Sequence, residues 1–320
     1  MLEKQSKIYT SFLQSSQSPF TPPMMKFAVN YSKPALALWR DQPDAFDLFK
    51  LPCWTDTVNE VIADYPGYIH FPLKVTGGDG TVRDSETKAP VDFARIEAFM
   101  KQTSTPIVNI HLAPSLKNNP DLDPADYSAG AAEKITGRMI RDVQTLVRHF
   151  GAENVIAEND AGDTDLVNAA ILPQVVNAII RETGCGFLFD ISHARLAALQ
   201  LGMDVKEYIA QLPTDRLREM HITGIQYLDQ GWQDRIRDSG LLKPDKLSRY
   251  RERWMDHLPI VDADWEFLAW AFGQIHTGAW REPWVASCEY GGIGGFFEAT
   301  MDEAIIRAQI PRLGRMLRGG

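Results

Sequence analysis

Cysteine is scarce in this 320-residue sequence: Cys53, Cys185 and Cys288 are odd in number and lie far apart. This pattern excludes a disulfide scaffold and a zinc finger, because both need sets of paired thiols. We therefore expect reduced, mostly buried thiols, as is typical of cytoplasmic proteins.

The sequence also lacks long hydrophobic runs and an excess of basic residues. No stretch approaches the ~18 consecutive apolar residues of a membrane span, and the N-terminus lacks the apolar core and cleavage site of a signal peptide. The formal net charge of −9 disfavours non-specific nucleic-acid binding, which needs a basic surface. We expect a cytoplasmic protein that binds neither membranes nor nucleic acid.

Short apolar runs typical of buried strands alternate with helical patterns along most of the chain. Strands are expected over residues 27–30, 46–50, 68–71, 106–112, 154–159, 186–190, 217–221 and 284–290. Continuous apolar strands that alternate with helices predict a parallel sheet covered by helices. Eight such units predict an α/β fold closed into a (β/α)8 TIM barrel. An open doubly wound sheet is the structural alternative.

We interpret the chain as one domain, because no linker interrupts the strand–helix units. Residues 1–25 are expected to form a polar N-terminal arm and residues 26–320 the barrel, with an insertion at about residues 225–258. A helix is expected over residues 164–183. The glycine-rich loop at residues 77–80 lacks the lysine and spacing of a nucleotide-binding motif, and we expect it to be flexible.

Histidines and carboxylates occur at or near the ends of six apolar runs: His70, His111, Glu158, Asp190, His221 and Glu289. In a barrel, the carboxyl ends of the strands converge on one mouth, where active sites form. One histidine at a strand end is more often structural, but burying six such groups without compensation would be very costly. Imidazoles and carboxylates together suit iron, manganese or zinc. The sequence therefore predicts a metal site and leaves the number of ions open.

The insertion carries several aromatic residues among charged ones. Tyr227, Trp232 and Trp254 are candidates for substrate binding if this segment is a loop above the barrel mouth. Ordinary packing on the surface is the alternative interpretation.

Two segments resemble the multinuclear non-haem iron-dependent oxidase (MNIO) family, which has a xylose-isomerase-like TIM barrel. They are Phe-Leu-Phe-Asp-Ile-Ser-His-Ala at residues 187–194 and Leu-Pro-Thr-Asp-Arg-Leu-Arg-Glu-Met-His-Ile-Thr-Gly at residues 212–224. The likeness extends from about residue 26 to 300. Asn30-Tyr-Ser departs from the family's glycine- and arginine-rich start, which indicates a divergent member.

The resemblance implies that strand-end residues hold two or three iron ions. It implies one ion among His70, His111 and Glu158, and neighbouring ions served by Asp190, His193, His221 and Glu289. Glu158 or another carboxylate would bridge. Asp256 and His257 occupy the place of a further aspartate–histidine pair of the family. Together with Asn159 they are candidates for a third metal or for supporting the ligands.

The function that the resemblance implies is oxidation with iron and dioxygen. The expected substrate is a peptide, which can contain cysteine, or a small thiol, and a partner protein can deliver the peptide. The first alternative is a sugar isomerase or epimerase with Mn²⁺ or Mg²⁺, or a hydrolase with Zn²⁺. Another is a metal-storing or regulatory barrel without activity. The number of histidines favours the oxidase.

Overall fold

The computed structural model describes residues 25–52, 61–85, 87–103 and 105–319. Eight strands form a ring of parallel neighbours in the order β3-β2-β1-β12-β9-β8-β7-β6. Their bounds are β1 Lys26–Asn30, β2 Leu48–Pro52, β3 Gly67–His70, β6 Val108–His111, β7 Val155–Glu158, β8 Gly186–Asp190, β9 Leu217–Ile222 and β12 Val285–Cys288. Because neighbours in the sequence are neighbours in the sheet, the predicted TIM barrel is confirmed and the doubly wound alternative is wrong.

The ring closes between β3 and β6, and side chains help to close it. The chain continues from β3 into the short strand β4 (Leu73–Lys74), which pairs with β6 and with the hairpin strand β5 (Arg83–Asp84). Between these pairings, the Asn109 amide accepts a hydrogen bond from Phe71 N (2.6 Å) and donates one to Phe71 O (2.8 Å). The Thr105 hydroxyl accepts another from Ile69 N, at 3.0 Å. We call this junction the seam.

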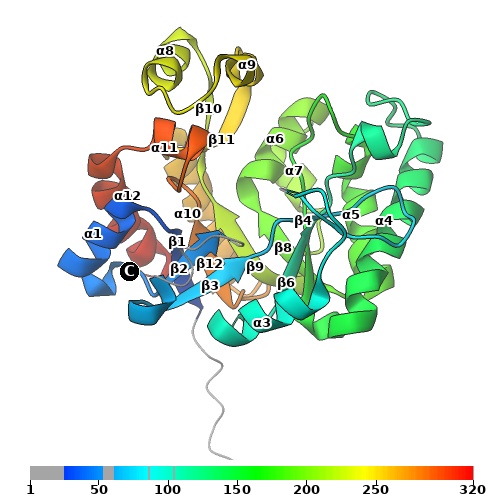
Figure 1. Cartoon of the computed structure of the whole chain (residues 1–320), viewed down its shortest axis with the longest axis horizontal. Helices are drawn as coiled ribbons and strands as arrows, with labels where there is room; N and C mark the ends of the chain where they lie inside the picture. Colours follow the sequence, from blue (N-terminus) through cyan, green and yellow to red (C-terminus); the bar gives the residue numbers. More distant parts are fainter. Residues whose placement is uncertain (1–24, 53–60, 86, 104, 320) are drawn as a thin grey trace, which may run out of the picture.

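Helices surround the barrel, as Figure 1 shows, with α1 beside α12 on one side and α4 beside α5 on the other. Several begin at polar caps, such as Ser32 before α1, Ser128 before α4 and Asp302 before α12. The bounds are α1 Lys33–Asp41, α3 Phe93–Thr103, α4 Ala129–Phe150, α5 Pro173–Thr183, α6 Ile191–Leu201, α7 Val205–Ile209, α10 Asp262–His276, α11 Gly295–Thr300 and α12 Glu303–Leu317.

Alternation along the strands separates two apolar regions. Outward residues of every barrel strand, such as Phe49 on β2 and Phe187 on β8, join the large core beneath the helices. Inward residues form two small clusters that meet at Trp284 and fill the lower barrel: Ala28, Leu48, Tyr68 and Val285 in one, Ile107, Ile156 and Leu188 in the other. Two residues further along most of these strands, the inward side chains become polar.

The insertion is a folded lobe rather than the expected loop. It consists of β10 (Gly224–Tyr227), α8 (Gln230–Asp238), α9 (Pro244–Leu247) and β11 (Trp254–Leu258), with β10 and β11 antiparallel. Figure 1 shows it at one end of the barrel. Leu228, Ile236 and Leu258 pack against Phe296 and Ala299 of α11. This apolar cluster gives the segment a core of its own, which the high density of charges in the sequence concealed.

Two further expectations need correction. The helix expected over 164–183 begins only at Pro173, because a loop and a short 3-10 turn (Asn168–Ile171) precede it and proline suits a first helical position. The loop at 77–80 is anchored rather than free. The buried Asp142 carboxylate accepts hydrogen bonds from the backbone nitrogens of Thr76, Gly78 and Gly80.

The thiols of Cys185 and Cys288 are free and buried, as expected. Cys53 and the predicted arm, apart from Met25, lie outside the described residues. None of the helices in the described ranges combines the length and apolarity that crossing a bilayer requires.

We predict that Asn109→Ala lowers the free energy of unfolding by roughly 2–4 kcal/mol, because it removes two hydrogen bonds to the backbone of Phe71. Urea unfolding of metal-free protein measures this change. Asn154→Ala is the matched control, since Asn154 makes one hydrogen bond to a helix end. Equal stability of both variants would show that the seam does not depend on Asn109.

Candidate metal centre

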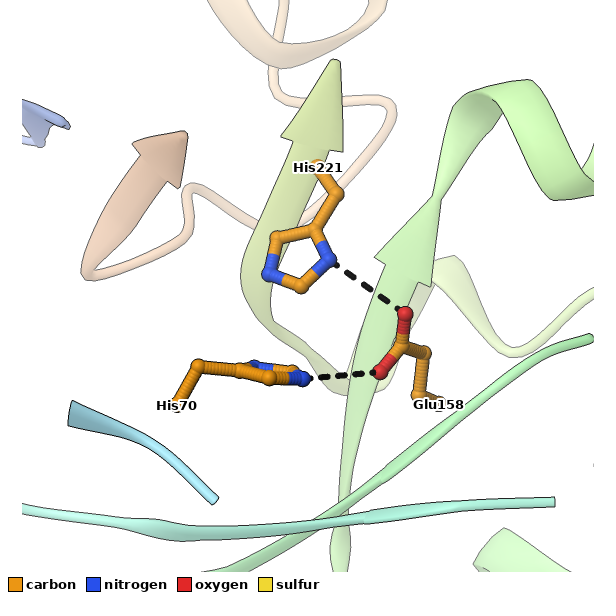
Figure 2. A group of neighbouring side chains, drawn as sticks. All are labelled: His70, Glu158 and His221. Carbon is orange, nitrogen blue, oxygen red and sulfur yellow. Dashed lines mark ion pairs between the residues drawn. The ribbon is translucent and has the colours of Figure 1, made fainter. Parts of the chain in front are cut away.

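The polar residues above the two small apolar clusters of the lower barrel converge on Glu158. Figure 2 shows this carboxylate on β7 between His70 of β3 and His221 of β9. Its Oε2 lies 3.5 Å from His70 Nε2 and 3.0 Å from His111 Nδ1. Its Oε1 lies 3.3 Å from His221 Nδ1 and 3.8 Å from His193 Nδ1. Each oxygen therefore faces a different pair of histidines, which is the arrangement that a bridging carboxylate needs.

A second group lies beside the first. His221 Nδ1 is 3.9 Å from Asp190 Oδ2 and 3.3 Å from Glu289 Oε1. Three overlapping ligand sets result: His70–Glu158–His221, Glu158–Asp190–His193 and Asp190–His221–Glu289. All seven residues predicted as ligands lie in this region, although His111 is in none of the three sets. Because Glu158 belongs to two of them, the arrangement suits more than one ion.

Asp190 has two separate roles. Its Oδ1 caps α6 by accepting hydrogen bonds from Ser192 N (2.7 Å) and His193 N (2.8 Å). Its Oδ2 faces the site, 3.6 Å from His193 Nε2. The capping role and the ligand role considered for this residue therefore use different oxygens.

Three candidates for support or a third metal adjoin His193. Asp256 Oδ2 lies 3.0 Å from His193 Nε2, and His257 Nε2 lies 3.5 Å from the same oxygen. The carbonyl of Asn159 lies 2.8 Å from His193 Nδ1, and its side chain bonds the backbone of Asp190. Asn159 thus orients two neighbours, while Asp256 and His257 face the site. His257 has the left-handed φ of 56°, so the chain bends sharply there.

The donor atoms fit a metal ion. Within the described residues, His70 Nδ1, Glu158 Oε2 and His221 Nδ1 are buried without a hydrogen-bond partner. Burial lowers the pKa values of His70, His111 and His221 well below the usual value, which keeps these imidazoles neutral, as ligands must be. Burial also raises the pKa of Glu158 to about 8. A cation would compensate this desolvated carboxylate.

His193 differs from the other histidines of the site. Burial opposes its protonation, but the nearby carboxylates of Asp190 and Asp256 outweigh burial and raise its pKa well above the usual value. Asp256 has a lowered pKa in turn: burial acts against this shift, and His257 and His193 overcome it. Without a cation, His193 therefore supplies positive charge to this side of the site.

Glu219 is a functional candidate that the sequence analysis missed. It accepts a hydrogen bond from His221 Nε2 at 3.0 Å and another from Tyr68 OH at 2.8 Å. The first contact places the proton of His221 on Nε2 and leaves Nδ1 free to bind a metal. Two-residue spacing could have revealed Glu219, because residues 219 and 221 of one strand face the same side of a barrel.

Lys50 and Asn30 were missed as well, although both end predicted strands. The Lys50 ammonium group contacts Glu289 Oε1, and burial lowers the pKa of this lysine to about 8. The Asn30 amide donates to the carbonyls of Glu289 (3.0 Å) and Gly291 (3.1 Å). Lys50 follows the inward Leu48 by two residues, and Asn30 follows the inward Ala28 by two. The two-residue spacing along these strands could therefore have revealed both as residues that face the site.

The site opens into a cavity of about 1360 Å³ between the barrel mouth and the inserted lobe. Arg249 and Arg253 of the lobe both pair with Asp163, at 3.2 Å, and so connect the lobe to the segment after β7. Exposed apolar side chains gather at the rim: Leu199, Trp254, Ile293 and Phe297.

The three aromatic candidates for substrate binding have different positions. Trp254 lines the cavity and is 44% exposed. Tyr227 is equally exposed and lies against Trp254, with ring centroids 6.0 Å apart, but is not among the described lining residues. Trp232 packs against the core of the lobe and donates to Gln226. The position of Trp254 is the one that suits substrate contact.

A family model described as "RiPP precursor modification enzyme MbnB/TglH/ChrH" matches residues 84–240. The matched region includes His111, Glu158, Asp190, His193 and His221. Over these residues the chain is similar to this family. The MNIO resemblance is thereby confirmed.

Distant curated relatives also match the chain. A UPF0276 protein of Chromobacterium violaceum is 27% identical over 136 residues, which are 41% of this chain and 47% of the relative. One of Pseudomonas aeruginosa is 25% identical over 189 residues, 58% of each chain. The chain spans about half the length of the curated relatives that it matches first.

Two solved structures are also similar at 11% identity. A D-psicose 3-epimerase from Clostridium cellulolyticum has a TM-score of 0.46 and covers 92% of this chain and 99% of its own. A xylose isomerase domain protein from Planctomyces limnophilus has a TM-score of 0.48, with 93% and 99% covered. The barrel of this protein is evident from its own strand order.

We predict that Glu219→Ala weakens binding of Fe²⁺ by about 10–100-fold, because His221 loses the partner that fixes its proton. Competition with a colorimetric chelator under nitrogen measures the affinity. The matched control is Tyr68→Phe, which removes the hydroxyl that donates to Glu219 but leaves the contact between Glu219 and His221. Unchanged affinity in a folded Glu219→Ala protein would refute this role.

Proposed function

We propose that this protein is an iron-dependent oxidase that uses dioxygen to modify a peptide. The observation that carries the proposal is the position of Glu158, whose two oxygens face two different pairs of histidines. Four imidazoles around one carboxylate form a nitrogen-rich set, which suits iron better than the hard cations Mg²⁺ and Mn²⁺. Similarity to a family of precursor-peptide modification enzymes supports the substrate class.

The proposed ligands are the residues on both sides of Glu158. His70 and His111 would hold one ion with Oε2, and His193, His221 and Asp190 would hold another with Oε1. Bound iron would supply electrons to dioxygen and positions for substrate.

The remaining residues of the site prepare the ligands and exclude water. Glu219 fixes the proton of His221, and Asn159 orients His193. Glu158, Asp190 and His221 are almost completely buried, so charge at the centre is poorly screened by solvent. A reactive centre at the bottom of a deep mouth is thereby protected from bulk water.

The size and the apolar rim of the cavity favour a peptide over a sugar as the substrate. Its volume of about 1360 Å³ exceeds the roughly 300–1,000 Å³ of typical small-molecule sites. Its rim carries exposed apolar side chains such as Trp254, Ile293 and Phe297, which suit the side chains of a peptide. We extend the proposal to cysteine-containing peptides, because a metal deprotonates a thiol that binds to it. A partner protein that delivers the peptide remains part of the proposal.

We predict at least two iron ions per chain in protein from iron-supplemented cells, measured by elemental analysis together with Mössbauer spectroscopy. Glu158→Ala should lose most of this iron, since both ligand groups share the residue. His149→Ala is the matched control, because His149 pairs with Glu97 on the surface, away from the site. A single manganese, magnesium or zinc ion, with turnover that needs no oxygen, would instead support the isomerase or hydrolase.

We predict that Trp254→Ala raises KM for the peptide about tenfold while iron content is unchanged. Partial burial of an indole against substrate contributes about 1.5 kcal/mol, which corresponds to this factor. Oxygen uptake at varied peptide concentration gives KM. Leu241→Ala is the control, since Leu241 is 45% exposed on the same lobe but is not among the described residues that line the cavity. Equal KM values in both variants would exclude Trp254 from substrate binding.

A further inference from the structure

Lys50 is a cation inside the candidate metal centre. It lies on β2, only 6% of the residue is exposed, and its side chain lines the same cavity as Glu158 and His193. Burying an ammonium group is costly unless an anion compensates it. The anion here is Glu289, whose Oε1 contacts the Lys50 Nζ atom.

This contact occupies the oxygen that a metal would need. Asp190, His221 and Glu289 form one of the three possible ligand sets. Glu289 Oε1, at 3.3 Å from His221 Nδ1, is the oxygen on which the ammonium group of Lys50 lies. A metal ion that uses this oxygen would have to displace Lys50 or share the oxygen with it, beside another positive charge in a poorly screened interior.

In neither of the other two sets does a described lysine form an ion pair with a member. His70 Nδ1, Glu158 Oε2 and His221 Nδ1 lack hydrogen-bond partners within the described residues. Within the described residues the ion pairs of Glu158 are all with histidines, which release their proton when they bind a metal. The sets centred on Glu158 are therefore available to ions, whereas the set with Glu289 already holds a side-chain cation.

We propose that Lys50 takes the place of a metal ion at Glu289 and limits the centre to two ions, both on Glu158. The inference rests on the proposed function only in that the centre binds iron. Glu289, a ligand in the sequence-based prediction, becomes the counterion of Lys50. Lys50 is then a residue that determines how many ions the centre holds.

The test is the ratio of iron to protein chain after anaerobic loading with Fe²⁺ and removal of loosely bound metal. The wild-type protein should hold two ions, and Lys50→Met should hold three, since Glu289 is freed. Lys74→Met is the matched control and should hold two, because Lys74 lines the same cavity but forms no ion pair with Glu289 in the described part of the chain. Elemental analysis and quantitative amino-acid analysis of the same samples give the ratio.

A double variant keeps the test decisive if Lys50→Met does not fold. Lys50→Met combined with Glu289→Gln removes both charges, so no buried charge is left without a partner. It should still hold two ions; a loss of one would show that Glu289 is a ligand and would overturn the proposal. Three ions in the wild type, or two in a folded Lys50→Met protein, would also overturn it. Wild-type protein without bound iron would contradict the proposed function itself.

Discussion

The burial of the Glu158 carboxylate among imidazoles is the constraint on which the rest of this structure depends. Burial favours the neutral form of Glu158 and of three histidines around it, and such a group of donors is stable only when a cation or a network compensates it. Lys50 and the hydrogen bond that His221 donates to Glu219 supply part of this compensation. The barrel is the scaffold that holds these groups from different strands within a few ångströms.

The alternation of side chains along the strands lets one barrel serve stability and chemistry together. On β7, Val155 and Ala157 face the helices, Ile156 fills the lower barrel, and Glu158 reaches the centre. A change on the outward side alters packing against helices without touching the ligands. The candidate ligands are therefore supported by the strands, and the inserted lobe lies across the cavity from them.

Much of this arrangement could be predicted from the sequence. Strand ends carry the ligands, so the general place of His70, Glu158 and Asp190 followed from the apolar runs and the barrel rule. The start of α5 could not be predicted, because the loop before it depends on contacts distant in sequence, such as Val167 N with Pro114 O. Lys50 escaped notice because a lysine at a strand end usually reaches solvent, and its partner Glu289 is 239 residues away.

The seam between β3 and β6 differs from the other junctions of the barrel, because side chains make part of its hydrogen bonds. Elsewhere neighbouring strands of the ring are joined directly by backbone ladders, whereas β3 and β6 are joined partly through Asn109 and Thr105. His70 and His111 lie on the two sides of this junction, with their Nε2 atoms 3.0 Å apart. A metal ion bound by both histidines would crosslink the two sides of this junction. Local unfolding of the seam and release of this ion would then be coupled, because each would favour the other.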